Sequence, residues 1–220
     1  MATVTETKPR PVSISMGELT LQADLVLPDS ARALVIFAHG SGSSRFSPRN
    51  RAVARTLNEA ALATLLLDLL TMEEQRIDDR TAHLRFNIPM LTERVAGAID
   101  WAKEDDKLRT LPIGLFGSST GAAAALNAAA ERPAEVGAVV SRGGRADLSI
   151  PSLPSVQAPV LLIVGGYDIA VIEMNREAAA NMRCENRLEI VQGAGHLFEE
   201  PGKLELVAEL ARDWFYKKLA

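Results

Sequence analysis

Apolar residues along this chain follow two different patterns. Five runs are almost continuously apolar, which is typical of strands buried on both faces of a parallel sheet. These runs cover residues 33–38, 63–67, 113–116, 136–140 and 160–164. Before them, residues 12–16 and 19–27 partly alternate apolar with polar side chains on either side of Gly17. This alternation predicts an antiparallel hairpin at the start of the fold.

The segments between the apolar runs have the periodicity of helices. Ser47 followed by Pro48 is typical of a helix start, because serine caps free N–H groups and proline fits the first turn. Apolar stripes at helical spacing are Val53 and Leu57; Leu91, Val95, Ala98 and Ala102; Val171, Met174, Ala178 and Met182; and Leu204, Val207, Leu210, Ala211 and Trp214. Strands and helices that alternate in this way predict a three-layer α/β sandwich with a mostly parallel sheet.

Composition fits one domain with a sizeable core. The chain has 220 residues, 47% of them hydrophobic, so we expect a single domain over residues 1–220 with a loose N-terminal segment at 1–11. That segment lacks the apolar core of a secretory signal. The longest apolar stretch, residues 62–70, is too short to span a bilayer. These features favour a cytoplasmic protein without membrane contact, and the single cysteine, Cys184, fits a structural thiol in a reducing compartment.

Charge and ligand chemistry disfavour several kinds of partner. The net charge of −4 is mild and the basic residues are scattered, so nucleic acid is not expected. The three histidines are far apart in sequence and lack nearby paired ligands, which disfavours a metal site. Neither a dinucleotide fingerprint nor a phosphate loop occurs. We therefore expect no cofactor.

The segment Gly117-Ser118-Ser119-Thr120-Gly121 is the most informative motif. It lies between a buried strand-like run and an alanine-rich segment. A strand, a Gly-x-Ser-x-Gly turn and a helix together expose a nucleophilic serine at the edge of a sheet, and the glycines allow a strained, closely packed backbone. The motif therefore predicts that Ser119 is a nucleophile. A simple Gly/Ser turn that binds phosphate remains an alternative.

A serine nucleophile needs a general base, and that base needs an acid to orient it. His196 lies on a glycine-rich loop after residues 188–191, and Asp168 follows the apolar run before it. Both positions fall at the carboxyl edge of a parallel sheet, and the chain order is serine, aspartate, histidine. Asp147 is a competing acid after the preceding strand. Asp168 as a helix N-cap and His196 as an ordinary loop histidine also remain open.

Four motifs together resemble the α/β-hydrolase superfamily, and most closely its compact dienelactone-hydrolase-like branch. They are Ala38-His39-Gly40-Ser41-Gly42, Gly117-Ser118-Ser119-Thr120-Gly121, Gly165-Gly166-Tyr167-Asp168 and Gly193-Ala194-Gly195-His196. The resemblance covers about residues 12–219. It implies an oxyanion hole formed by the backbone N–H groups of Ser41 and Thr120, with His39 supporting the loop. Dienelactone hydrolases proper carry a cysteine where Ser119 stands, so lactone specificity is not carried over.

We therefore expect a serine hydrolase that cleaves small or short-acyl carboxylic esters through an acyl-enzyme. The short, proline-containing segment 141–159 leaves no room for a lid domain, which favours an open site. Arg45 and Arg142 are candidates for binding a substrate carboxylate, although ion pairs and solvated side chains are alternatives.

The same residues would serve an acyltransferase or a perhydrolase, and the fold is also compatible with a non-catalytic binding protein. The expected partner is a small-molecule ester. The sequence does not indicate an oligomeric state.

Overall fold

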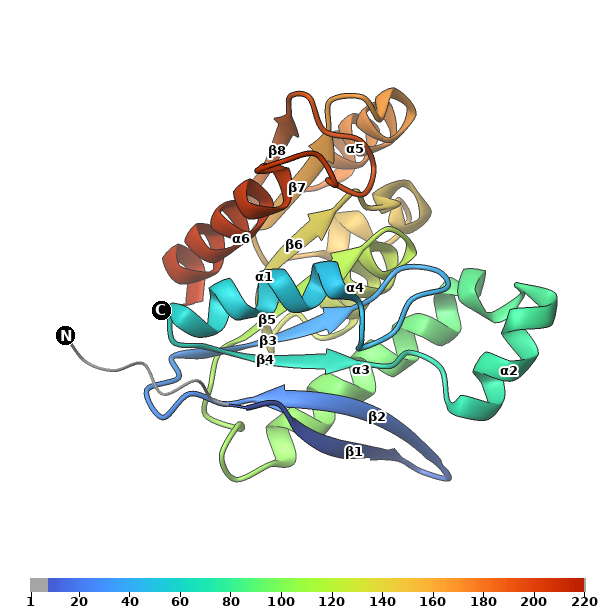
Figure 1. Ribbon diagram of the computed structural model, residues 1–220, viewed down its shortest axis with the longest axis vertical. Coiled ribbons are helices and arrows are strands. Elements are labelled where there is room, and N and C mark those ends of the chain that lie inside the picture. The colour runs from blue at the N-terminus through green and yellow to red at the C-terminus, as the bar shows by residue number, and fades with distance from the viewer. Residues whose placement is uncertain (1–7, 220) are drawn as a thin grey trace.

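The computed structural model describes residues 8–219. Within this part of the chain, an eight-stranded sheet has the strand order β1-β2-β4-β3-β5-β6-β7-β8, with helices on both faces (Figure 1). The strands are β1 (Arg10–Met16), β2 (Leu19–Val26), β3 (Ala33–Ala38), β4 (Leu62–Leu67), β5 (Ile113–Ser118), β6 (Val136–Arg142), β7 (Val160–Gly165) and β8 (Asn186–Val191). The helices are α1 (Pro48–Glu59), α2 (Met72–Thr81), α3 (Ile88–Glu104), α4 (Thr120–Glu131), α5 (Ile169–Asn181) and α6 (Lys203–Leu219), with short 3₁₀ turns η1 (Leu84–Phe86), η2 (Ala146–Ser149) and η3 (Leu153–Ser155).

The pairing of the strands confirms the predicted sheet. β1 and β2 form the expected antiparallel hairpin, and β2 also pairs antiparallel with β4. The remaining neighbours pair in parallel. Every residue of β3, β4, β5 and β7 is buried, because helices cover both faces of the sheet.

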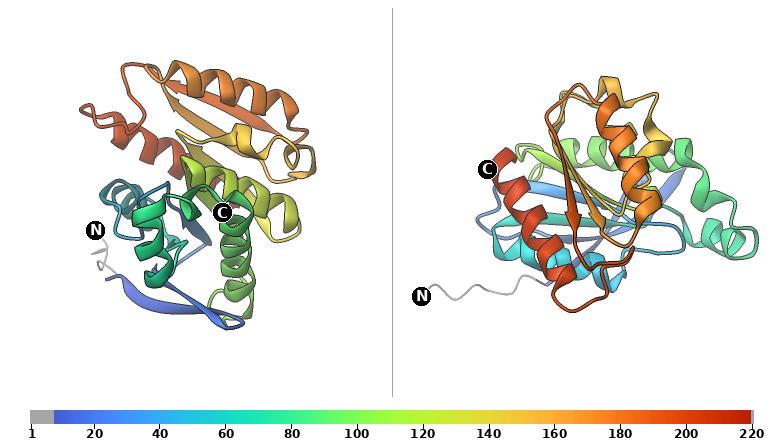
Figure 2. Two further views of the ribbon diagram at one scale, coloured as in Figure 1. Left: turned by 90° about the vertical axis from the view of Figure 1, so that its right-hand side faces the viewer. Right: turned by 90° about the horizontal axis from the view of Figure 1, so that it is seen from above.

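Helices lie on both faces of the sheet (Figure 2), and a large apolar core on each face holds the three layers together. On one face, residues of α1 and α6 such as Leu57 and Phe215 pack with Phe37 and Phe116 of the sheet. On the other face, α3, α4 and α5 contribute to a separate core that includes Val95. Among the described residues, no helix is long and apolar enough to cross a bilayer.

Two parts of the chain differ from the expected boundaries. Residues 1–7 of the expected loose segment lie outside the described residues, but Arg10 and Pro11 already pair with β2, so the strand begins before the expected boundary. Hydrophobic periodicity does not predict the helical segment that contains α2 and η1. Thr71 and Glu74 form a capping box at the start of α2, and this Thr-x-x-Glu spacing is the signal that indicates the helix.

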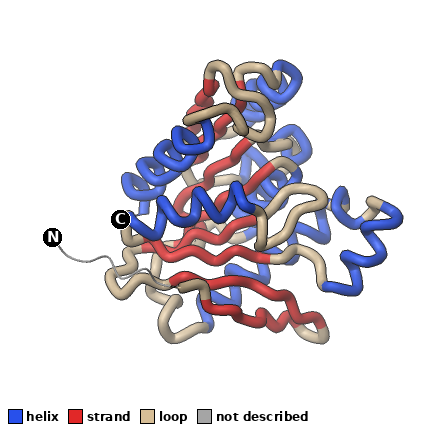
Figure 3. The backbone as a smooth tube through the Cα atoms, in the orientation of Figure 1, coloured by secondary structure: helices blue, strands red, loops and turns tan. Residues whose placement is uncertain are grey.

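The carboxyl ends of the parallel strands meet at one edge of the sheet. The loops beyond these ends, tan in Figure 3, carry Ser41 after β3, Asp168 after β7 and His196 after β8. Ser119 directly follows β5, and Arg142 ends β6. The topology therefore collects the candidate site residues from five strands at one edge.

Gly121 lies where α4 passes the end of β3. A Cβ at this position would lie 2.4 Å from the carbonyl oxygens of both Ala38 and His39. We expect Gly121→Ala to lower the free energy of unfolding by roughly 1–3 kcal/mol, because the helix must shift away from the backbone of β3. Urea denaturation measures the change.

Gly202→Ala provides a control, because a Cβ there meets nothing within 4 Å and adds only the strain of a positive φ of 76°. A free energy of unfolding for Gly121→Ala within about 0.5 kcal/mol of the wild type would contradict the close packing.

Candidate active site

Ser119 occupies a strained turn between β5 and α4. Its φ of 51° and ψ of −123° are uncommon for a residue with a side chain. Three backbone hydrogen bonds hold it there: the Ser119 N–H donates to the Arg142 carbonyl at 3.2 Å, and the Ser119 carbonyl accepts from the N–H groups of Arg145 at 3.0 Å and Ala122 at 3.1 Å. A Cβ at Gly117 would lie 2.3 Å from the Ala122 Cα. The turn therefore requires glycine close to the serine, as the motif predicts.

The structure brings His196 and Asp168 into direct contact. His196 Nδ1 lies 2.6 Å from Asp168 Oδ2. Asp168 occupies the N-cap position of α5 but makes no side-chain cap hydrogen bond, so its carboxylate serves His196 rather than the helix. With the Nδ1 proton donated to Asp168, the Nε2 atom is the nitrogen left to accept a proton.

The competing acid Asp147 is placed elsewhere, and so is His83, another of the three histidines. Asp147 accepts two hydrogen bonds from Arg145, at 2.9 Å from Nε and 2.8 Å from Nη2. His83 is exposed at the start of η1. Of the competing residues that the sequence offered, only Asp168 contacts the candidate base.

Several candidate residues line one pocket of about 200 Å³. Ser119, His196, Ser41 and Arg142 line it together. A larger groove of about 920 Å³ adjoins it at Ser43 and Ser47. The two hollows therefore share residues of the segment between β3 and α1.

The loop after β3 is fixed against the start of α4. Ser41 Oγ lies 2.9 Å from Thr120 Oγ1. In the described part of the chain, no backbone carbonyl accepts a hydrogen bond from the N–H of Ser41 or of Thr120. Neither N–H is therefore used by the protein backbone there, and the N-terminal dipole of α4 favours negative charge near the Thr120 N–H.

His39 anchors this loop from inside the protein. The ring is buried, its Nδ1 donates to the Gly40 carbonyl at 2.9 Å, and its Nε2 accepts the Leu69 N–H at 3.1 Å. Burial lowers the pKa of His39, and the raising effects of the Gly40 carbonyl and of Asp68 do not offset it. The ring is thus neutral and has both nitrogens satisfied, which fits the structural role expected for it.

The two arginines suggested by the sequence lie in different surroundings. Arg142 is only 7% exposed, and its Nη1 has no hydrogen-bond partner among the described residues. Burial, followed by the positive charge of Arg49, lowers the pKa of Arg142 to about 10. Arg45 instead forms ion pairs with Asp68 and Asp24 and lines the larger groove.

Arg49 lines the small pocket beside Arg142, although no sequence motif singles it out. The Ser47-Pro48 helix start predicts that Arg49 lies in the first turn of α1, but it does not predict where the Arg49 side chain points.

In residues 8–219, no group of three or more His, Cys, Asp or Glu side chains is arranged to hold a metal ion. Burial raises the pKa of the half-buried Cys184 thiol, which disfavours a reactive thiolate.

Comparison with known proteins identifies the family. A family model described as an alpha/beta hydrolase domain matches residues 31–210, and the chain belongs to this family. Within it, the chain resembles a dienelactone hydrolase from Anabaena variabilis. That solved structure is 56% identical, covers 97% of this chain and 99% of its own, and superposes with a TM-score of 0.95.

More distant relatives extend the comparison. Est1E from Butyrivibrio proteoclasticus shares the fold with a TM-score of 0.81 at 19% identity, covering 94% of this chain and 98% of its own. Two Mycobacterium tuberculosis proteins, each named "Putative phosphoribosyl transferase", are 50% identical over 208 residues. The match covers 94% of this chain but 46% of theirs, so the chain spans less than half the length of these curated relatives.

The buried, neutral His39 makes stability depend on pH. Its pKa is lowered in the folded protein, so the unfolded chain takes up the proton more readily. The neutral His39 ring therefore contributes its full stabilisation above the unfolded pKa of about 6.5, and this stabilisation is lost as the pH falls below that value. We expect the free energy of unfolding from urea titrations to decrease between about pH 7.5 and pH 5.5.

His39→Gln should flatten this slope, since the glutamine Oε1 can still accept the Leu69 N–H without taking up a proton. The matched control is His83→Gln, which removes an exposed histidine and should keep the wild-type slope. Equal slopes in the wild type and in His39→Gln would contradict the account.

Proposed function

We propose that this chain is a serine hydrolase that cleaves carboxylic esters through an acyl-enzyme. The observation that carries the proposal is the contact of 2.6 Å between His196 and Asp168, beside the pocket that His196 shares with Ser119. Base, acid and strained serine come from three different strand ends, and an activated serine needs this combination. Membership of the hydrolase family supports the same reaction class.

In the proposed mechanism, Ser119 Oγ attacks the ester carbonyl while its proton passes to His196 Nε2. Asp168 stabilises the imidazolium that forms. The N–H groups of Ser41 and Thr120 donate to the oxyanion of the tetrahedral intermediate. His196 then returns the proton to the departing alcohol, which leaves an acyl group on Ser119.

Water releases the acid in the second half of the reaction. His196 takes a proton from the attacking water, and a second oxyanion forms at the same carbonyl carbon. Collapse of this intermediate breaks the acyl bond to Ser119, whose oxygen receives the proton from His196. The serine and the histidine thus return to their starting protonation states without any other reactant.

The size of the pocket supports a small acyl group. Its volume of about 200 Å³ lies below the roughly 300–1,000 Å³ of sites that enclose drug-sized ligands. The segment between β6 and β7 contains only the short turns η2 and η3 within the described structure, so no lid covers the site from there. Small or short-acyl esters therefore remain the proposed substrates.

Arg142 supports a preference for esters that carry a negative charge. Its guanidinium is buried with an unpartnered Nη1 and lines the pocket with Arg49. Arg49 already pairs with Glu199 at 2.9 Å, whereas an anion beside the unpartnered Arg142 would offset its buried charge. A carboxylate on the acyl group would supply that anion. Arg45 already has two carboxylate partners, so this proposal rests on Arg142.

Acyl transfer is the second candidate, because an alcohol, amine or peroxide acceptor would use the same residues. The Mycobacterium tuberculosis relatives are named after phosphoribosyl transfer, but they are more than twice as long as the matched part. We therefore propose ester hydrolysis for this chain. Product analysis with added acceptors separates transfer from hydrolysis.

Removing the nucleophile should abolish turnover. We expect Ser119→Ala to lower kcat for a short aryl ester by at least roughly a thousandfold, while circular dichroism and the melting temperature show an intact fold. Ser155→Ala, which changes an exposed serine on η3, is the matched control and should retain wild-type rates. Near-normal hydrolysis by Ser119→Ala would overturn the assignment.

Removing the buried guanidinium should change the preference for charge. We expect Arg142→Gln to lower kcat/KM for a monoaryl succinate about tenfold to a hundredfold, the value of a charge-assisted hydrogen bond. For the neutral aryl acetate, kcat/KM should change by less than about threefold. Arg45→Gln should leave the ratio between the two substrates unchanged. A ratio that is equal in the wild type and in Arg142→Gln would exclude an anion site at Arg142.

A further inference from the structure

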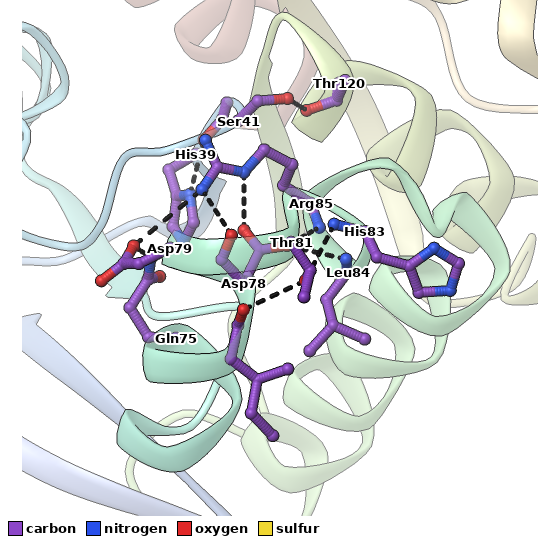
Figure 4. Close-up of polar contacts among 12 residues, drawn as sticks. His39, Ser41, Gln75, Asp78, Asp79, Thr81, His83, Leu84, Arg85 and Thr120 are labelled. Carbon is purple, nitrogen blue, oxygen red and sulfur yellow. Dashed lines mark hydrogen bonds and ion pairs between the residues drawn. The ribbon is translucent and has the colours of Figure 1, made fainter.

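The segment of α2 and η1 places an ion pair, between the buried Asp78 and the partly exposed Arg85, next to the loop that carries Ser41 (Figure 4). The Asp78 side chain is fully buried. Its Oδ1 accepts hydrogen bonds from the backbone N–H groups of Leu84, at 2.7 Å, and of Arg85, at 3.0 Å. Its Oδ2 accepts from Arg85 Nε at 2.6 Å, and the Asp78 carbonyl accepts from Arg85 Nη2 at 3.1 Å.

These contacts fix the Arg85 guanidinium in one orientation. Burial alone would raise the pKa of Asp78, but the hydrogen bonds from the Arg85 backbone and side chain and from Leu84 outweigh it, so the pKa is lowered. The carboxylate is therefore charged at neutral pH and keeps its partner. A planar guanidinium held through Nε and Nη2 has its third nitrogen, Nη1, aimed in a fixed direction.

Nη1 of Arg85 lies against Gly42. It is 3.1 Å from the position that a Cβ would take at Gly42, and the φ of Gly42 is 66°. Arg85, Gly42, Ser41 and Thr120 all line one residual space of about 10 Å³. A space of this size is at the lower limit for a single water molecule. The guanidinium therefore packs directly on the turn that follows Ser41.

Other contacts hold the residues before Gly42, and the Ser43 N–H donates to the Gly40 carbonyl across the turn at 3.2 Å. His39 fixes the start of the loop through Gly40 and Leu69, and the Ser41 hydroxyl meets Thr120. Gly42 itself is exposed to solvent, and a glycine with free space around it adopts many backbone conformations. The hydrogen bond across the turn and the packing of Arg85 on Gly42 together limit these conformations.

We propose that Arg85 is a positioning residue that holds the turn at Gly42 and, through it, the backbone of Ser41, so that the N–H of the Gly40–Ser41 peptide faces the reacting carbonyl. The inference rests on the proposed function, since the direction of this N–H matters only if the loop stabilises an oxyanion. Arg85 does not touch the substrate in this account. It acts through the backbone of Gly42, and Asp78 acts through Arg85.

The proposal has a specific kinetic signature. Loss of the guanidinium should leave substrate binding unchanged and misalign one oxyanion donor. The transition state is then stabilised less, while the bound ground state is not affected. We expect Arg85→Met, which keeps most of the side-chain volume, to lower kcat about tenfold to a hundredfold. KM should stay within about threefold of the wild type, because the ground state does not use the misaligned donor.

The experiment compares Arg85→Met, the double variant Asp78→Asn/Arg85→Met, Arg132→Met and Ser119→Ala in the full chain. The double variant avoids a buried, unpaired carboxylate, because the amide oxygen of the introduced asparagine can still accept from the backbone N–H groups of positions 84 and 85. Arg132→Met is the matched control, since it removes an arginine bound to Asp100 through two hydrogen bonds of 2.9 Å, at the far end of α4 from Ser119. Rates for a neutral short aryl ester are expressed per site labelled by a fluorophosphonate for the variants that keep Ser119, and per chain for Ser119→Ala.

Inhibition by an aryl trifluoromethyl ketone provides a second readout. This ketone forms a tetrahedral adduct whose oxyanion mimics the transition state. Its inhibition constant should rise by about the same factor as kcat/KM falls in both Arg85 variants, with Arg132→Met at the wild-type value. A purely structural role for Arg85 would lower the labelled fraction and the melting temperature but leave the rate per labelled site unchanged.

The proposal is overturned if the rate per labelled site and the ketone affinity of both Arg85 variants stay within about twofold of the wild type. In that outcome Ser119→Ala still loses activity, so the proposed hydrolase function stands. If the wild type shows no more hydrolysis or labelling than Ser119→Ala, the hydrolase proposal fails and the positioning role fails with it.

Discussion

Ser119 leaves the sheet in a conformation that the backbone adopts only because α4 lies unusually close to two strands. A Cβ at Gly117 would meet the Ala122 backbone, and a Cβ at Gly121 would meet the carbonyls at the end of β3. This close approach sets the distance between the serine and the β3 loop. The positions of Thr120 and Ser41, and so of any oxyanion between them, depend on it.

The turn after β6 connects the serine to the candidate base. Arg142 and Arg145 form backbone hydrogen bonds with Ser119, and Gly143 lies against the ring of His196, with its ideal Cβ position 3.4 Å from Cε1. A change in this turn would move the serine and the histidine together. The same turn is next to the buried guanidinium of Arg142, which lines the pocket, so under the proposed function one element would set both the substrate charge preference and the position of the serine.

The sequence predicts the sheet, and it places Ser119, Asp168 and His196 at one sheet edge, because continuous apolar runs and glycine-rich strand ends are local signals. It does not separate Arg45 from Arg142. The difference arises from Asp24 and Asp68, which bind Arg45. The sequence also does not predict the contact of Arg85 with Gly42, since this contact joins an unpredicted helical segment to a distant loop. Such contacts depend on how elements pack, and hydrophobic periodicity carries no information about them.

The central claim is that Ser119 is activated by His196. Mass spectrometry of the intact protein and of its peptides after reaction with a fluorophosphonate tests it most directly, because the reagent bonds to an activated serine. Activation by His196 predicts one adduct per chain, located on Ser119, and its loss in His196→Ala. Absence of an adduct on the wild type, an adduct on another residue, or undiminished labelling of His196→Ala would contradict the claim.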